Sequence, residues 1–117
     1  MPKPVVLIVH EQTYLVDLLK ETLPNEDLVV AGASEAVEAA GLFHEHQPNL
    51  AVIDPELPGA MHLLSIIRMS VDRCAVIALT SSSEQRKQLH EMGIETVIDR
   101  GVSLKVLLRA LPQARSF

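Results

Sequence analysis

Residues Leu50-Ala51-Val52-Ile53-Asp54-Pro55-Glu56-Leu57-Pro58-Gly59 form the stretch that decides the fold of this chain. Its apolar first half is a short continuous run bounded by turn-forming residues, which is typical of a strand buried on both faces of a parallel sheet. Pro55 has no N–H to donate to a neighbouring strand, so we expect the strand to end at Asp54. The stretch therefore predicts a carboxylate at the carboxyl end of an interior strand, where open α/β sheets place their binding crevice. The alternative is that Asp54 only begins a turn or caps the next helix.

Apolar runs and helical spacing alternate along the rest of the chain. Further strands are predicted at residues 5–9, 28–31, 75–79 and 96–98. The predicted helices cover residues 13–23, the segment between Ser34-Glu35 and Gln47-Pro48, residues 61–70, residues 84–92 and a last segment from Ser103 to Leu111. Five strands that alternate with helices through short connections predict one α/β domain over residues 1–117, a parallel sheet with helices on both faces.

The composition excludes several classes of protein. Apolar residues make up 48% of the 117 residues and the mean hydropathy is +0.23, so the chain is globular, and no apolar run is long enough to span a bilayer. A net charge of −5 without a Lys/Arg run argues against direct contact with nucleic acid. The single cysteine, Cys74, fits a reducing compartment and inert packing, and we expect a cytoplasmic protein.

Polar residues follow several of the predicted strands. His10 and Glu11 come after the first strand, Asp54 ends the third, Thr80 follows the fourth and Arg100 follows the fifth. Since all strands of a parallel sheet point the same way, these residues share one edge. A pair of carboxylates favours a hard cation such as Mg²⁺, and a hydroxyl with a fixed positive charge suits the oxygens of a phosphoryl group.

Several of these residues, together with their neighbours, resemble the pattern of a known family. Asp54 with Leu57-Pro58-Gly59, Thr80 after an Ala-Val-Ile-Ala-Leu strand, and the segment from Gly93 to Arg100 are similar to the receiver domain of two-component response regulators. The resemblance covers essentially the whole chain. It implies a flavodoxin-like fold, in which five parallel strands have the order 2-1-3-4-5.

The resemblance also implies roles for individual residues. Asp54 matches the phosphoryl acceptor, Thr80 the switch hydroxyl that binds a phosphoryl oxygen, and Arg100 the position of the family's lysine. The implied partner is a sensor histidine kinase or a phosphotransfer protein, and the implied output is a changed contact with an effector domain or a downstream protein.

A magnesium site is implied as well. Glu11 matches the second acid of the family's metal-binding pair, Asp54 contributes its carboxylate, and Glu56 contributes its backbone carbonyl. His10 stands where the family usually has the first acid of the pair, and an imidazole suits Mg²⁺ less well than an oxygen ligand does.

The chain departs from the family pattern at other positions too. Arg100 replaces a lysine, Gly101 replaces the proline that usually follows, Val97 stands where an aromatic is common, and His62 replaces a glycine. Two hypotheses follow: an atypical receiver that is phosphorylated on Asp54, and a degenerate pseudo-receiver that signals by protein binding without phosphorylation.

Other hypotheses have less support. A flavodoxin-like enzyme or nucleotide binder lacks its usual phosphate loop, because the residues after the first strand include no glycine. His44-Glu45-His46 has the composition of a metal site, but two histidines at this spacing on a helix point in different directions. The polar helix over residues 84–92 is a candidate output surface, and a homodimer through the last two helices remains open.

Overall fold

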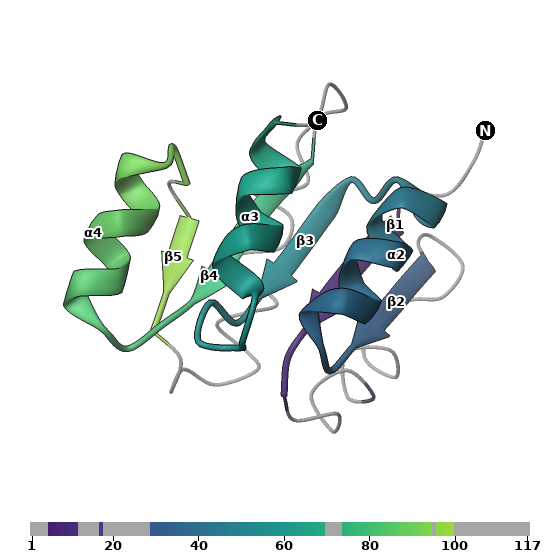
Figure 1. The fold of residues 1–117 in the computed structure, drawn as a ribbon, viewed down its shortest axis with the longest axis horizontal. Coiled ribbons are helices and arrows are strands. Elements are labelled where there is room, and N and C mark those ends of the chain that lie inside the picture. The colour runs from purple at the N-terminus through teal and green to yellow at the C-terminus, as the bar shows by residue number, and fades with distance from the viewer. Residues whose placement is uncertain (1–4, 12–16, 18–28, 70–73, 95, 100–117) are drawn as a thin grey trace.

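A computed structural model of the chain describes residues 5–11, 17, 29–69, 74–94 and 96–99. The sheet contains β1 (Val5–Val9), β2 (Val29–Ala33), β3 (Leu50–Ile53), β4 (Ala75–Leu79) and β5 (Thr96–Ile98). All neighbouring strands are parallel, and their order is β2-β1-β3-β4-β5 (Figure 1). The predicted flavodoxin-like order 2-1-3-4-5 is therefore confirmed.

The register of the strands brings their carboxyl ends together. Val9 of β1 pairs with Ala33 of β2 and with Ile53 of β3. On the other side, Ile53 pairs with Ala78 of β4, and Leu79 pairs with Ile98 of β5. The residues that follow these strands consequently lie along one edge of the sheet.

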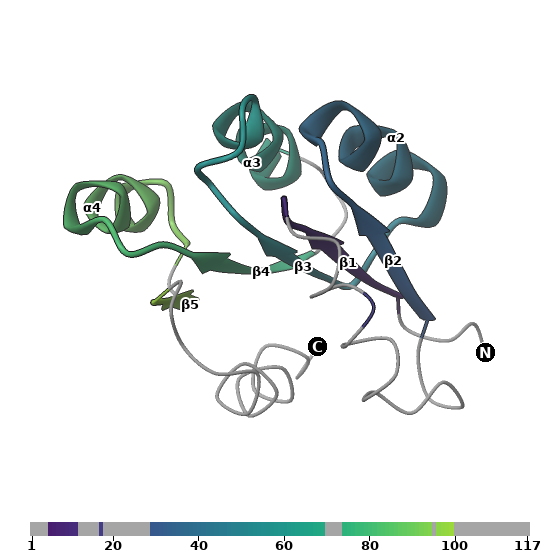
Figure 2. The same ribbon diagram turned by 90° about the horizontal axis from the view of Figure 1, so that it is seen from below.

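The described helices are α2 (Ala36–His46), α3 (Ala60–Met69) and α4 (Ser83–Glu91). All of them lie on the same face of the sheet (Figure 2). Apart from residue 17, the residues of the helices predicted over 13–23 and 103–111 lie outside the described part of the chain. No helix in the described part of the chain is long and apolar enough to cross a membrane, and the cytoplasmic location stays a prediction.

An aliphatic core lies between the sheet and these helices. Every residue of β3 is buried, as the continuous apolar run predicts for an interior strand. Small side chains of α2 let it approach the sheet closely, since Ala39 is fully buried. Leu63 and Leu64 of α3 and Leu89 of α4 fill the remaining space.

Several predicted boundaries are wrong by a few residues. Residue Gly32, expected to lie beyond the second strand, pairs with Ile8 inside β2, because the ladder to β1 continues as far as Ala33. Helix α3 begins at Ala60 rather than at residue 61. Helix α4 covers residues 83–91 rather than 84–92, because the side chain of Ser82 caps its first turn. The predicted role of Gly93 after this helix is confirmed by its φ of 89°.

Candidate functional site

Asp54 follows β3 directly and its side chain is completely buried. Its main-chain N–H donates to the carbonyl oxygen of Val9 at 2.9 Å, which continues the β1–β3 ladder by one residue. Its carboxylate oxygen Oδ1 accepts a hydrogen bond from the N–H of Glu56 at 3.0 Å. This bond from a side chain to the main chain two residues later is typical of an Asx turn, and it fixes the direction of the carboxylate.

The two residues after β1 differ in their environment. The main-chain N–H of His10 donates to the carbonyl oxygen of Ala33 at 3.0 Å, and only 6% of His10 is exposed. Glu11, the next residue, is exposed. The exit of β1 thus presents one buried imidazole and one exposed carboxylate to the edge that carries Asp54.

Thr80 follows β4 and is also completely buried. Its main-chain N–H donates to the carbonyl oxygen of Ile98 at 2.9 Å. Its hydroxyl donates to Oε1 of Gln85 at 2.6 Å and accepts a hydrogen bond from the N–H of Ser82 at 3.1 Å. Because β3 and β4 are neighbours, Asp54 and Thr80 leave the sheet on adjacent strands.

Gln85 was not among the site residues predicted from the sequence. Besides accepting a hydrogen bond from the Thr80 hydroxyl, its carboxamide donates through Nε2 to the carbonyl oxygen of Pro55 at 3.4 Å. Gln85 therefore connects the residue after Asp54 with the residue after β4. A signal was present, since Ser82 and Gln85 have the spacing of a capping box, in which the residue at the third helical position makes hydrogen bonds of its own.

Two contacts hold α4 and its preceding loop to β5 and to the residue that follows it. The guanidinium of Arg86 donates through Nη1 to the carbonyl oxygen of Val97 at 3.2 Å, and the Ser81 hydroxyl donates to Oδ1 of Asp99 at 3.2 Å. Val97 itself is half-buried. Arg100 and Gly101, for which the sequence analysis makes predictions, lie outside the described residues.

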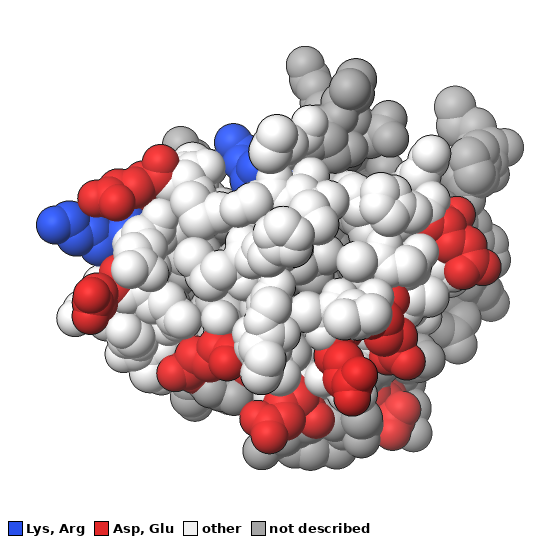
Figure 3. All heavy atoms as spheres, viewed as in Figure 1, with Lys and Arg blue, Asp and Glu red and all other residues white. Residues whose placement is uncertain are grey.

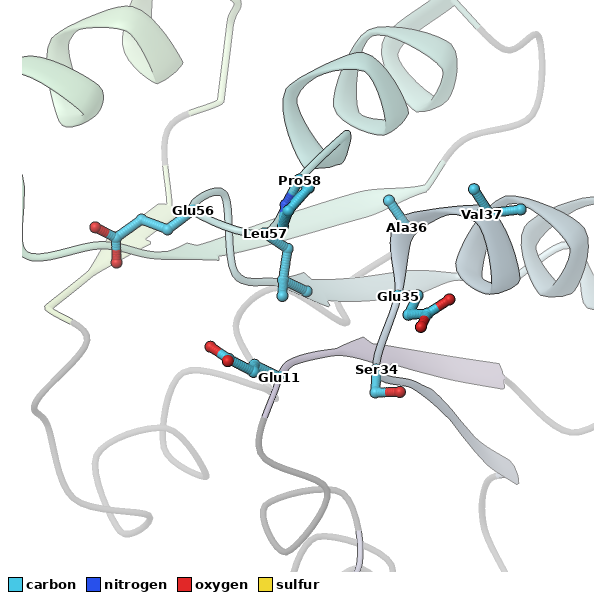
Figure 4. Close-up of a pocket in the computed structure, with 8 residues that line it drawn as sticks. All are labelled: Glu11, Ser34, Glu35, Ala36, Val37, Glu56, Leu57 and Pro58. Atoms are coloured by element: carbon cyan, nitrogen blue, oxygen red, sulfur yellow. The ribbon is translucent and has the colours of Figure 1, made fainter.

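A pocket of about 500 Å³ opens between the loops that follow β1, β2 and β3, and Glu11, Glu56 and Leu57 are among the residues that line it. The Leu57 side chain points into the space between these loops, whereas the carboxylates of Glu11 and Glu56 both point to the left of the view, away from Ser34 and Glu35 (Figure 4). Acidic side chains gather along the edge of the molecule at which the strands end, as the lower edge of Figure 3 shows. This edge is electrostatically suited to cations.

The donor set at this edge fits Mg²⁺ in part. Two carboxylates, of Asp54 and Glu11, and the carbonyl of Glu56 are oxygen donors of the kind that Mg²⁺ prefers, with water completing its octahedron. The imidazole of His10 does not fit this preference. Among the described residues there is no cluster of three or more His, Cys, Asp or Glu side chains that could hold a metal, and His44, Glu45 and His46 are exposed.

Comparison with known proteins decides the family. The family model of the response regulator receiver domain matches residues 6–112. The chain belongs to this family. A receiver domain is a signalling module rather than a classical enzyme, its family typically binds Mg²⁺, and it implies a histidine kinase as partner.

One curated relative supports the assignment. The receiver domain is 27% identical to the probable C4-dicarboxylate response regulator DctR of Priestia megaterium, over 96% of this chain and 52% of the relative. The chain thus spans about half the length of this relative.

Solved structures with the same fold include other receiver domains. The non-phosphorylated HemR receiver domain of Leptospira biflexa is 26% identical with a TM-score of 0.84, and the match covers 98% of this chain and 96% of that one. The BeF3-activated receiver domain of Klebsiella pneumoniae RstA has a TM-score of 0.82 at 21% identity, with 97% and 99% coverage. The second likeness supports the fold alone.

Proposed function

We propose that this receiver domain accepts a phosphoryl group on Asp54, with Mg²⁺ bound beside it, and thereby switches a contact with another protein or domain. The observation that carries the proposal is the buried Asp54 carboxylate at the end of β3, oriented by the N–H of Glu56 and adjacent in the sheet to the strand that ends at Thr80. Burying a carboxylate costs free energy unless it is paired, so a buried acid at the sheet edge where open α/β folds bind their ligands supports a functional role.

The transfer uses the carboxylate as a nucleophile. An oxygen of Asp54 attacks the phosphorus of a phosphohistidine on the kinase or on a phosphotransfer protein, and an oxygen–phosphorus bond forms. The nitrogen–phosphorus bond breaks, its electron pair stays on the imidazole, and the imidazole takes up a proton. The hydrogen bond from Glu56 holds the carboxylate in one direction, which reduces the entropy that the attack costs.

The metal would be held by Asp54, Glu11 and the carbonyl of Glu56. When bound, Mg²⁺ supplies positive charge that offsets the charge of the phosphoryl oxygens. His10 contributes no negative charge when neutral, so we expect the affinity for Mg²⁺ to lie below that of a site with two acids after β1. In this sense the domain is an atypical receiver.

The switch would act through Thr80 and Arg100. A phosphoryl group on Asp54 adds negative charge and acceptor oxygens at this edge, and the Thr80 hydroxyl and the Arg100 guanidinium are groups that bind such oxygens. The movement of Thr80 would be passed to α4, whose exposed face is mostly polar. Because the chain spans about half of its curated relative, we propose that residues 1–117 form one receiver unit that acts on an effector domain or a downstream protein.

A second candidate is a pseudo-receiver that binds a partner without phosphorylation. The buried imidazole of His10 favours it, because this residue occupies the site without an acid's charge. Intact-mass measurement after incubation with a small-molecule phosphodonor separates the two. The proposal predicts one phosphoryl adduct that requires both Mg²⁺ and Asp54 and is missing in Asp54→Asn. If neither a small donor nor a phosphorylated histidine kinase produces an adduct, the pseudo-receiver is the correct account.

A further inference from the structure

We propose that Gln85 is a positioning residue that holds the Thr80 hydroxyl in the resting state and exchanges its hydrogen bonds when Asp54 is phosphorylated. The inference rests on the proposed function of Asp54. Gln85 would then be a residue of α4 that responds directly to the movement of Thr80.

The Thr80 hydroxyl has a single proton, and it donates this proton in a hydrogen bond to Gln85. A hydroxyl donates one hydrogen bond and accepts up to two. Here Oγ1 donates to Oε1 of Gln85 at 2.6 Å and accepts from the N–H of Ser82 at 3.1 Å. Donation to a phosphoryl oxygen on Asp54 therefore requires that the bond to Gln85 break first, so Gln85 competes with the phosphoryl group.

The N-terminus of α4 shows where the freed carboxamide can go. Ser82 is the N-cap of α4, and its hydroxyl accepts from the N–H of Gln85 at 3.2 Å, which is one half of a capping box. In a complete capping box the Gln side chain would accept from the N–H of Ser82. In the resting structure Thr80 accepts that N–H instead. When Thr80 turns to the phosphoryl group, Gln85 can complete the box, so the Ser82 N–H keeps an acceptor in both states.

The second bond of Gln85 connects this exchange to the acceptor residue. Its Nε2 donates to the carbonyl oxygen of Pro55, the residue that follows Asp54, at 3.4 Å. Gln85 is half-buried, so this contact is partly shielded from water. If turning to the Ser82 N–H moves the carboxamide away from Pro55, Gln85 makes two hydrogen bonds in the resting state and one in the switched state, and this difference favours the resting state.

Binding of beryllofluoride with Mg²⁺, a mimic of the phosphoryl group, tests the exchange. Gln85→Ala should bind the mimic about two- to tenfold more tightly than the wild type, because one net hydrogen bond that favours rest is lost. Gln88→Ala, on the exposed part of the same helix, is the matched control and should leave the affinity unchanged. In a Thr80→Val background, Gln85→Ala should have no effect on the affinity.

Hydrogen exchange of the Ser82 amide gives a readout that a merely structural role would not produce. In the wild type this amide should stay protected with and without the mimic, whereas in Gln85→Ala it should lose protection only when the mimic is bound. Equal affinities of wild type and Gln85→Ala for the mimic, or equal protection of the Ser82 amide in both proteins, would overturn the proposed role of Gln85. Either result would leave the proposed phosphorylation of Asp54 intact. If no variant binds the mimic, the proposed phosphorylation of Asp54 fails and this inference falls with it.

Discussion

The main-chain N–H of His10 donates to the carbonyl oxygen of Ala33 at 3.0 Å, so the β1–β2 ladder extends one residue beyond the end of β1. The bond fixes the main chain of His10 at the edge where Asp54 leaves the sheet, and only 6% of the His10 residue is exposed. A side chain without negative charge at this position avoids the repulsion that a further carboxylate would impose on Asp54 and Glu11. The same feature would limit the attraction for a divalent cation.

His10→Asp should lower the stability of the metal-free protein and raise its affinity for Mg²⁺. Without metal, the new carboxylate beside a buried acid should lower the free energy of unfolding by about 1–2 kcal/mol. The affinity for Mg²⁺ should rise roughly tenfold, since ligand charge sets the strength of such sites. Thermal unfolding with and without Mg²⁺ measures both effects. His10→Asn supplies an oxygen donor without charge, and an equal gain in this control would show that charge is not the cause.

Leu89 should be the anchor of α4. It is the only fully buried side chain of this helix, whose other residues are polar or partly exposed. Leu89→Ala should lower the free energy of unfolding by about 2–5 kcal/mol, the usual range for a leucine deleted from a core. Denaturant unfolding checks the value. Met69→Ala, at a side chain that is 84% exposed, should change stability by less than about 0.5 kcal/mol.

Two glycines should respond to alanine with opposite signs. Gly93 has a φ of 89°, which strains any residue with a Cβ, so Gly93→Ala should cost about 1–2 kcal/mol. The new Cβ would lie 2.8 Å from Nη2 of Arg68, but that exposed side chain is free to move away. Gly41 lies inside α2 with open space around a new Cβ, so Gly41→Ala should stabilise the protein by about 0.5–1 kcal/mol. Unfolding curves of the two variants provide the comparison, and a shift in the same direction for both would contradict the backbone argument.

Because of Cys74, the free energy of unfolding should decrease above pH 9.0. Burial raises the pKa of its thiol from 9.0 to about 12, so above pH 9.0 the unfolded chain loses this proton while the folded chain retains it. The folded state then binds more protons, and the free energy of unfolding decreases as the pH rises from 9.0 toward 12. Cys74→Ala should show a shallower decline over this range in denaturant titrations. Parallel declines in the two proteins would mean that other groups account for the loss.

The order of the strands was predictable because the sheet is built from short apolar runs whose ends are marked by polar residues. Asp54 and Thr80 stand directly after such runs, so their position at one edge follows from the parallel arrangement. The burial of His10 was less apparent, because a polar residue after a strand is usually exposed. It accompanies the extra ladder bond from His10 to Ala33, which depends on the register of a strand far away in the sequence.

Gln85 shows why contacts within a site are harder to predict than its location. The spacing from Ser82 to Gln85 indicates a capping box, and local rules predict that the carboxamide turns back to the Ser82 N–H. In the structure the hydroxyl of Thr80 accepts that N–H, and the carboxamide turns to Thr80 and Pro55 instead. The choice between these arrangements depends on the pairing of β3 with β4, which brings Pro55 and Thr80 close to Gln85. A local sequence pattern carries no information on that pairing.

Reductive trapping of the phosphorylated protein tests the central claim most directly. Borohydride reduces an aspartyl phosphate to homoserine, and peptide mapping by mass spectrometry locates the changed residue. After incubation with a phosphodonor and Mg²⁺, the account predicts homoserine at position 54 and none in the sample without Mg²⁺. Homoserine at another carboxylate, or an unchanged Asp54 after treatment with a phosphorylated histidine kinase, would contradict it.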